Sequence, residues 1–392
     1  VSYGFLKISD MKKTILLLAF LTFSFLANAQ IIYEEFNSDR LQETRRLKIQ
    51  LPRNYDINTD KVYPVIIVLD ADYLFEPVAG NVDYFSYWED MPESIVVGVM
   101  QARTRFDDCN YDPGNYLPSE KGADFFEFLG LELLPYIDES YRTAKFVVGV
   151  GHDFTANFLN FYLYKSPPLF NGYIVLSPEL SPNATTRMAG RIPKITTEIF
   201  YYLATATDDI KELTQDAEAL NKALKSIDTP NFNYYYDNFQ GATHYSLVAR
   251  GIPVALEKMF AIYRPISREE YNTVLLTIKT PISDYLIDKY KTIKDLFGID
   301  DIIRVNDYIA TTKAAEKQKQ WESLKVIAEM AKREYPETVL GPYYLGRYYE
   351  EVGEPKKAMR VFQGAFDKEE VGFITLDVML DKADKIKEDF GY

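Results

Sequence analysis

The chain has 392 residues and 47% of them are apolar, which is enough to bury a large core and to form two domains. Its net charge of −14 argues against nucleic-acid binding, because phosphates require a basic surface. One cysteine, Cys109, allows no internal disulfide, and two histidines without any Cys/His cluster argue against a metal site. We expect no metal and no cofactor.

The N-terminal part has the pattern of a secretory signal peptide over residues 11–29. Met11-Lys12-Lys13 supplies positive charge, Thr14 to Leu26 is apolar, and Ala27-Asn28-Ala29 is a small-residue cleavage site. The apolar run is short for a membrane span. We therefore expect export to the periplasm or the medium, with no membrane span after cleavage.

Several later segments predict strands buried on both faces of a parallel sheet. These near-continuous apolar runs are Tyr63 to Asp70, Ser94 to Val99, Lys145 to Val150, Gly172 to Ser177 and Ile199 to Ala204. An earlier strand is expected at Arg46 to Pro52, and Gly122 to Ser140 has the spacing of a helix. Strands that alternate with helices predict a doubly wound α/β domain.

The stretch Gly151-His152-Asp153-Phe154-Thr155 follows one of these strands and precedes a segment, Phe158 to Lys165, that can form a helix. Strand, sharp turn and helix make the nucleophile elbow of α/β-hydrolases, where G-x-S-x-G presents a serine. Here Asp153 stands in place of the serine and Thr155 in place of the second glycine.

Motifs in a fixed order resemble the esterase family that includes enterochelin esterase and esterase D. They are Leu69-Asp70-Ala71-Asp72, Val97-Gly98-Val99, Gly122-Ala123-Asp124, Tyr141-Arg142-Thr143, Gly151-His152 and Leu169 to Pro178. The resemblance implies an α/β-hydrolase fold over residues 30–263 and a small-molecule ester or related ligand.

The resemblance also implies a site. It places the histidine of a triad at His244 and its acid at Asp208 or Asp209, with Asp209 preferred by spacing; either acid is alternatively a helix N-terminal residue stabilised by the helix dipole. The resemblance assigns four further residues to the oxyanion hole and the pocket: Ala71, Phe154, Arg103 and Arg105. The two arginines are candidates to meet an acidic ligand, or ordinary loop charges.

The nucleophile departs from the family pattern. A carboxylate has no proton to give to a histidine base, so Asp153 excludes serine esterase chemistry at this position. We expect Asp153 to form an ion pair with His244, which would remove the base.

The first hypothesis is a hydrolase fold without hydrolase activity that keeps a ligand pocket or an interaction surface. The alternative is an active hydrolase, either esterase-like or with Asp153 as a covalent nucleophile and His244 activating water, because the elbow also looks like that of haloalkane dehalogenases and epoxide hydrolases.

Two other nucleophile candidates have structural interpretations. Ser177 follows a strand but is not at an elbow, and Cys109 lies in a loop without a neighbouring histidine.

The C-terminal part changes character. We expect a connector over 264–303 with an amphipathic helix from Ile282 to Gly298, then tetratricopeptide-like helical repeats over 304–392 as a small all-α domain. The spacing rests on two sets of residues, one repeat length apart: Trp321, Ala328, Ala331 and Tyr335, then Leu345, Gly346, Tyr349, Gly353, Ala358, Phe362 and Ala365. Such an array binds a protein or peptide, or braces the rest of the chain.

Overall fold

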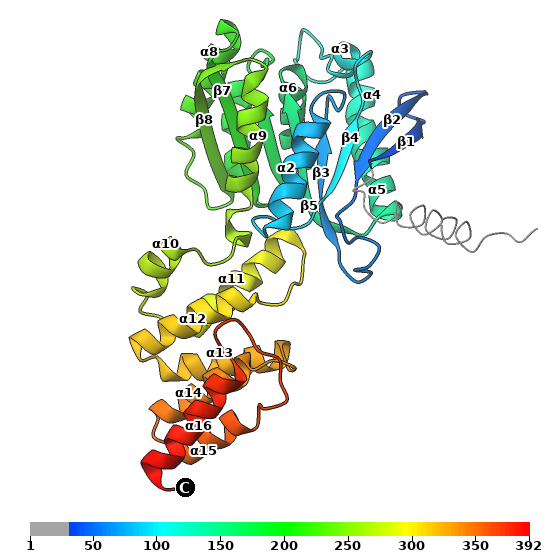
Figure 1. The fold of residues 1–392 in the computed structure, drawn as a ribbon. Helices are drawn as coiled ribbons and strands as arrows, with labels where there is room; N and C mark the ends of the chain where they lie inside the picture. Colours follow the sequence, from blue (N-terminus) through cyan, green and yellow to red (C-terminus); the bar gives the residue numbers. More distant parts are fainter. Residues whose placement is uncertain (1–30) are drawn as a thin grey trace, which may run out of the picture. The chain divides into compact units, whose positions relative to one another are not determined.

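The computed structural model describes residues 31–392, so the predicted signal peptide lies outside the described residues. The chain divides into two compact units. One comprises residues up to 84, 93–143 and 147–255, and the other comprises residues 85–92, 144–146 and 256–392. Figure 1 shows the elements of both.

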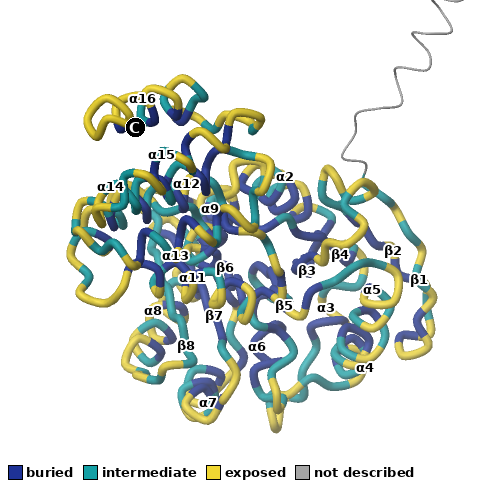
Figure 2. The backbone as a smooth tube through the Cα atoms, turned by 90° about the horizontal axis from the view of Figure 1, so that it is seen from below, coloured by how far each residue is buried: buried dark blue, intermediate teal, exposed yellow. Residues whose placement is uncertain are grey.

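The first unit is built on one eight-stranded sheet in the order β1-β2-β4-β3-β5-β6-β7-β8. The strands are β1 (Ile32–Ser38), β2 (Glu43–Gln50), β3 (Tyr63–Val68), β4 (Ile95–Val99), β5 (Thr143–His152), β6 (Gly172–Leu176), β7 (Ile199–Asp208) and β8 (Phe232–Thr243). β2 is antiparallel to both β1 and β4, and all later neighbours are parallel. β3 to β7 are buried on both faces over most of their length, and their sequences are largely apolar, as the sequence predicts (Figure 2). The exposed exceptions are Lys145 of β5 and Thr207 and Asp208 at the end of β7.

Helices cover both faces of the sheet. They are α2 (Phe75–Tyr87), α3 (Arg105–Asp108), α4 (Lys121–Glu127), η1 (Phe128–Leu133), α5 (Leu134–Ser140), α6 (Phe154–Asn160), η2 (Phe161–Tyr164), α7 (Ala184–Arg191), η3 (Ile192–Lys194), α8 (Lys211–Leu224) and α9 (Ser246–Met259). Gly149 of β5 faces Leu159 of α6, whereas Gly251 of α9 faces Leu176 of β6. The predicted helix over 122–140 is present but passes through a π-helical segment at η1, next to Pro135, which has no N–H for an α-helical bond.

The second unit is all-helical. It contains η4 (Ala261–Tyr263), α10 (Arg268–Glu270), η5 (Tyr271–Leu275), α11 (Ile282–Phe297), α12 (Val305–Gln318), α13 (Trp321–Glu334), α14 (Leu340–Glu351), α15 (Pro355–Gln363) and α16 (Leu376–Phe390). Gly346 is where the repeat spacing requires a small residue: a Cβ there would lie 2.3 Å from the Phe362 ring. α14 and α15 therefore approach closely at this glycine, as in the predicted repeat.

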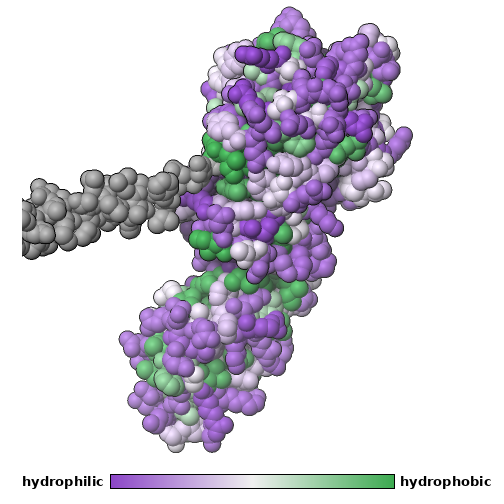
Figure 3. All heavy atoms as spheres, turned by 90° about the vertical axis from the view of Figure 1, so that its right-hand side faces the viewer, coloured by the Kyte–Doolittle hydropathy of each residue, from purple (hydrophilic) through white to green (hydrophobic). Residues whose placement is uncertain are grey.

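Large apolar side chains lie mostly inside the units. On the face seen in Figure 3, hydrophilic residues cover most of the surface and hydrophobic residues form separate patches. Within residues 31–392, no helix has both the length and the apolar character needed to span a bilayer.

Candidate active site

The turn between β5 and α6 is a sharp elbow with Asp153 at its tip. Asp153 has φ 62° and ψ −118°, a conformation that few non-glycine residues adopt. Its N–H donates to the carbonyl of Leu176 at 3.0 Å, and α6 begins at the next residue, Phe154. The helix therefore starts four residues earlier than the sequence predicts, and the carboxylate occupies the position from which an elbow presents its nucleophile.

Gly151 and Thr155 explain why this turn forms without the second glycine. A Cβ on Gly151 would lie 2.7 Å from the carbonyl of Thr155, so glycine is required there. Thr155, by contrast, contributes its hydroxyl: Oγ1 accepts from the His152 N–H at 3.0 Å and lies 2.8 Å from Oδ2 of Asp70 as a donor. The threonine thus cross-links the turn to the end of β3.

Arg105 of α3 binds two carboxylates. Its Nη2 donates to Oδ2 of Asp153 at 3.2 Å and to the carbonyl of His152 at 3.1 Å. Its Nε lies 2.9 Å from both oxygens of Asp70, and the guanidinium packs 5.2 Å from the ring centre of Phe154. Burial raises the pKa of Asp70, and Arg105 opposes this rise. Arg105 is therefore part of the site and not an ordinary loop charge.

The ion pair expected between Asp153 and His244 is not found among the described residues. His244 instead pairs through Nδ1 with Oδ1 of Asp209 at 2.8 Å, and Ser177 Oγ lies 3.3 Å from the same nitrogen. Burial raises the pKa of Asp209, but hydrogen bonds from His244, Ser177 and an N–H outweigh it, so the pKa falls below its ordinary value. With Nδ1 donating to this carboxylate, Nε2 keeps its lone pair and can accept a proton.

The alternative acid, Asp208, lies elsewhere. It is exposed, and its Oδ1 accepts from the neighbouring Thr207 hydroxyl at 3.4 Å. Of the two candidates, Asp209 is the one that meets His244. The helix that follows does begin as expected, with α8 starting at Lys211.

The second histidine, His152, holds the segment that carries the first. The two rings lie 4.3 Å apart between centroids, and His152 Nε2 is 3.1 Å from the carbonyl of His244. Burial, with the neighbouring His244 and the charge of Arg105, lowers the pKa of His152 to about 3, so the ring is neutral. Nε2–H then donates to that carbonyl and Nδ1 accepts from the Tyr73 hydroxyl at 3.0 Å. His152 and Tyr73 therefore fix the position of His244.

The predicted oxyanion and pocket residues have different environments. The Ala71 N–H donates to the carbonyl of Val99 at 3.0 Å, so it is already used within the fold. Phe154 is the first residue of α6, where an N–H has no acceptor within the helix and can face a ligand. Arg103 is exposed at the surface. Only Phe154 and Arg105 of the four lie next to Asp153.

A buried ion pair that the sequence did not reveal anchors the helix carrying Arg105. Arg45 of β2 donates to Oδ2 of Asp108 at 2.8 Å and makes a second, shorter contact with Oδ1; the side chains are 4% and 0% exposed. Gln101 donates to the same carboxylate at 2.9 Å and accepts from the Asp70 N–H at 3.0 Å. Beside it, burial raises the pKa of Cys109 well above its ordinary value, which makes this thiol a poor nucleophile.

In the part of the chain from Ile31 onward, no three or more His, Cys, Asp or Glu side chains are grouped so that they could hold a metal ion. The candidate site consists of the His244–Asp209 pair, the Asp153 carboxylate, and Arg105 with its second partner Asp70.

Comparison with known proteins decides the family. Residues 38–247, more than half of the chain, match the family described as "Putative esterase". The chain belongs to this esterase family. No curated protein is similar enough to count as a match.

Solved structures share the fold of this chain. A protein from Capnocytophaga ochracea DSM 7271, described as uncharacterised, is 31% identical with a TM-score of 0.83, over 92% of this chain and all of that one. An IroE-like serine hydrolase from Shewanella oneidensis is 21% identical with a TM-score of 0.55, over 78% of this chain and 99% of that one. The BES protein from Bacillus cereus is 19% identical with a TM-score of 0.52, over 59% of this chain and 97% of that one. The last two likenesses concern the fold alone, which is that of an α/β-hydrolase.

Proposed function

We propose that this esterase-family protein binds a carboxylic ester or a related small molecule without serine esterase chemistry. The observation that carries the proposal is the carboxylate of Asp153 at the elbow tip, hydrogen-bonded to Arg105 at 3.2 Å. A serine hydroxyl gives its proton to histidine and then attacks; a carboxylate bound to a guanidinium has no such proton, and the ion pair weakens it as a nucleophile. The signal-peptide pattern of residues 11–29 supports export to the periplasm or the medium as part of this proposal.

The surroundings of Asp153 retain other parts of a hydrolytic site. The His244–Asp209 pair leaves Nε2 free to act as a base, and Phe154, as the first residue of α6, has an N–H without an acceptor inside the helix. We therefore expect a serine introduced at the elbow to use His244 as its base. This gives the proposal a direct test.

The test compares wild type, Asp153→Ser and Asp153→Ala on p-nitrophenyl acetate. We expect turnover above the uncatalysed rate only in Asp153→Ser, and we expect His244→Ala added to that variant to remove it. Asp153→Ala controls for the release of Arg105 without adding a hydroxyl. Wild-type turnover that His244→Ala abolishes would refute the proposal.

One observation favours a second candidate function, hydrolysis through Asp153 itself. The His244–Asp209 pair is intact, which is what a reaction in which His244 activates water would require. In that reaction an Asp153 oxygen attacks an electrophilic carbon, whose bond to halide or to the epoxide oxygen breaks, and an alkyl ester of Asp153 forms; an acyl ester would give an anhydride and release its alcohol. Water, deprotonated by His244, then attacks the Asp153 carbonyl carbon, the bond to the substrate-bound oxygen breaks, and that oxygen takes the proton back from His244 as the carboxylate is restored. The Arg105 pair is the argument against it. Mass spectrometry of His244→Ala, in which the covalent adduct on Asp153 would accumulate, decides between the two functions across epoxide, halide and ester substrates.

A further inference from the structure

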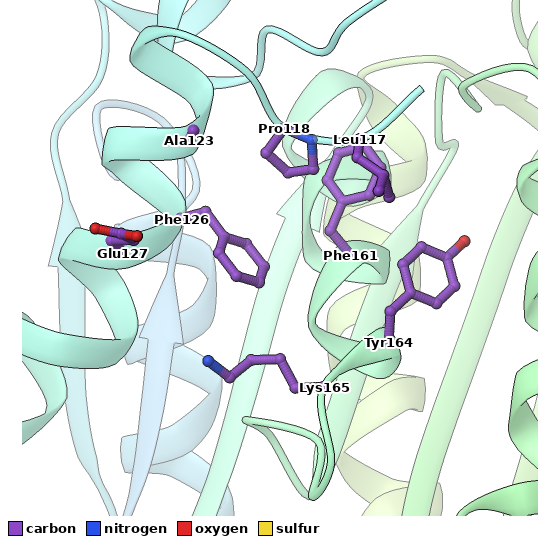
Figure 4. A pocket seen from close by; sticks show the side chains of 8 residues that line it. All are labelled: Leu117, Pro118, Ala123, Phe126, Glu127, Phe161, Tyr164 and Lys165. Atoms are coloured by element: carbon purple, nitrogen blue, oxygen red, sulfur yellow. The ribbon is translucent and has the colours of Figure 1, made fainter. Parts of the chain in front are cut away.

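A hollow of about 300 Å³ opens on the surface of the first unit, between α4 and η2. It is lined by Leu117, Pro118, Ala123, Phe126, Glu127, Phe161, Tyr164 and Lys165. Figure 4 shows the Phe126 and Phe161 rings facing the hollow from two different helices, with Leu117 and Pro118 at one end. Six of the eight lining residues are apolar or aromatic, and the two charged ones are considered separately below.

Tyr162 holds in place the Phe126 ring, which forms an aromatic wall of the hollow. The ring of Phe126 stacks on buried Tyr162, with centroids 4.3 Å apart and an angle of 10°. The Tyr162 hydroxyl donates to the carbonyl of Phe126 at 2.9 Å, which fixes the pair to the backbone. A flat apolar ligand would therefore meet a wall that needs no ordering on binding.

The charges around the hollow favour an anion. Glu127, the one acid of the lining, is neutralised by Arg40 at 2.6 Å. The Lys165 ammonium lies 5.4 Å from the centre of the Phe126 ring, and within residues 31–392 no carboxylate lies at ion-pair distance from it. Arg187 is near enough to oppose the burial-driven rise in the pKa of Tyr164. This rim is thus locally positive on a chain whose net charge is −14.

We propose that this hollow binds a small aromatic carboxylate. Its ring would stack between Phe126 and Phe161, since aromatic rings prefer offset or edge contacts with other rings. Its carboxylate would pair with Lys165. The volume is at the lower end of the range for ligand pockets, which limits the ligand to one or two fused rings.

This site is separate from the elbow. Phe161 follows α6, whose first residue is next to Asp153, so seven helical residues or roughly 10 Å of helix lie between them. The proposal therefore stands or falls independently of the proposed function.

The test is calorimetric titration of the full chain with 2-naphthoate. We expect saturable binding with one site, weakened about fivefold by Lys165→Gln, the effect of one partly exposed ion pair. Ala123→Phe, which places a ring in the hollow from the half-exposed face of α4, is expected to weaken binding at least about tenfold. The neutral analogue 2-naphthalenemethanol should bind wild type and Lys165→Gln equally.

Matched controls fix the location of the ligand. Lys222→Gln makes the same charge change at an exposed position on α8 and should leave the affinity unchanged. Asp153→Ala should also leave it unchanged. The proposal is overturned if 2-naphthoate does not bind, if Ala123→Phe binds it as wild type does, or if Asp153→Ala alters the affinity, which would place the ligand at the elbow.

Discussion

Asp153 occupies a backbone conformation that usually requires glycine, and its side chain explains how it stays there. Aspartate tolerates positive φ better than most residues other than glycine. Here the carboxylate is 13% exposed and is bound by Arg105, which is itself held between Asp153 and Asp70. Asp153 therefore combines a strained backbone conformation with a side chain that an ion pair holds in place.

Arg105→Gln tests how strongly this arrangement depends on one guanidinium. Asp70 is 3% exposed, and without Arg105 its buried charge would lack its main partner. We expect a loss of about 3 kcal/mol in the free energy of unfolding at neutral pH, because breaking a buried pair leaves an uncompensated charge. The loss should shrink as the pH falls, since a protonated Asp70 needs no cation.

Urea unfolding of Arg105→Gln and Arg103→Gln at the same pH checks this. Arg103 is exposed two residues away and its substitution should change stability by less than about 0.5 kcal/mol. Equal effects of the two substitutions would show that Arg105 contributes no more than a surface charge.

Part of this site could be predicted from the sequence. The elbow follows from the local pattern of strand, turn and helix, whereas His244 and its acid, with Asp209 preferred by spacing, are implied by the resemblance to the esterase family. The partner of Asp153 could not be predicted, because Arg105 lies 48 residues away along the chain and only the packing of α3 brings it there. The resemblance to the esterase family did place Arg105 in the pocket, but as a residue to meet an acidic ligand or as an ordinary loop charge, and not as the partner of Asp153.

The sequence does not predict β1 and α2, because their hydrophobic patterns are weak. β1 is an edge strand whose residues alternate between half-buried and exposed, so it lacks the apolar run that marked the others. α2 contains Pro77 and Gly80, both of which weaken a helix signal. Tertiary packing against β4, where a Cβ on Gly98 would meet the Phe75 ring at 2.5 Å, stabilises α2 despite them.

Gly346→Ala separates helix propensity from packing. Propensity alone predicts stabilisation by about 1 kcal/mol, because alanine is the better helix former. The Phe362 ring lies 2.3 Å from the position of the new methyl, so we expect destabilisation by about 2 kcal/mol instead. Both tryptophans, Trp88 and Trp321, belong to the second unit, and urea unfolding followed by their fluorescence reports this change.

The matched control is Gly80→Ala in α2. Nothing lies within 4 Å of a Cβ at this position, so the same substitution should stabilise the first unit by about 0.5–1 kcal/mol, measured by circular dichroism. If Gly346→Ala stabilised the protein to the same extent, the conclusion that α14 and α15 approach closely at Gly346 would be contradicted.

At the scale of the whole molecule, each unit has its own buried apolar cluster. In the first unit the cluster lies between the sheet and the helices on the α6 face. In the second unit the cluster draws on segments before and after residue 304, with Leu275, Ile282 and Leu286 buried together with Tyr308 and residues of α13 to α16. The sequence pattern suggested repeats only from 304 onward, because the earlier helix lacks the repeat spacing.

This shared cluster predicts what happens to a chain that ends at residue 303. Leu275, Ile282 and Leu286 are 0% exposed in the full chain, and removing α12 to α16 takes away the side chains that cover them. Exposing each costs about 1.5–3 kcal/mol, so we expect the shortened chain to self-associate and to bind 1-anilinonaphthalene-8-sulfonate. Leu275→Ser and Leu286→Ser together should reduce both effects in the shortened chain and destabilise the second unit in the full one. If the shortened chain stays monomeric and binds no dye, residues 264–303 do not need α12 to α16 to bury their apolar side chains, and the prediction is wrong.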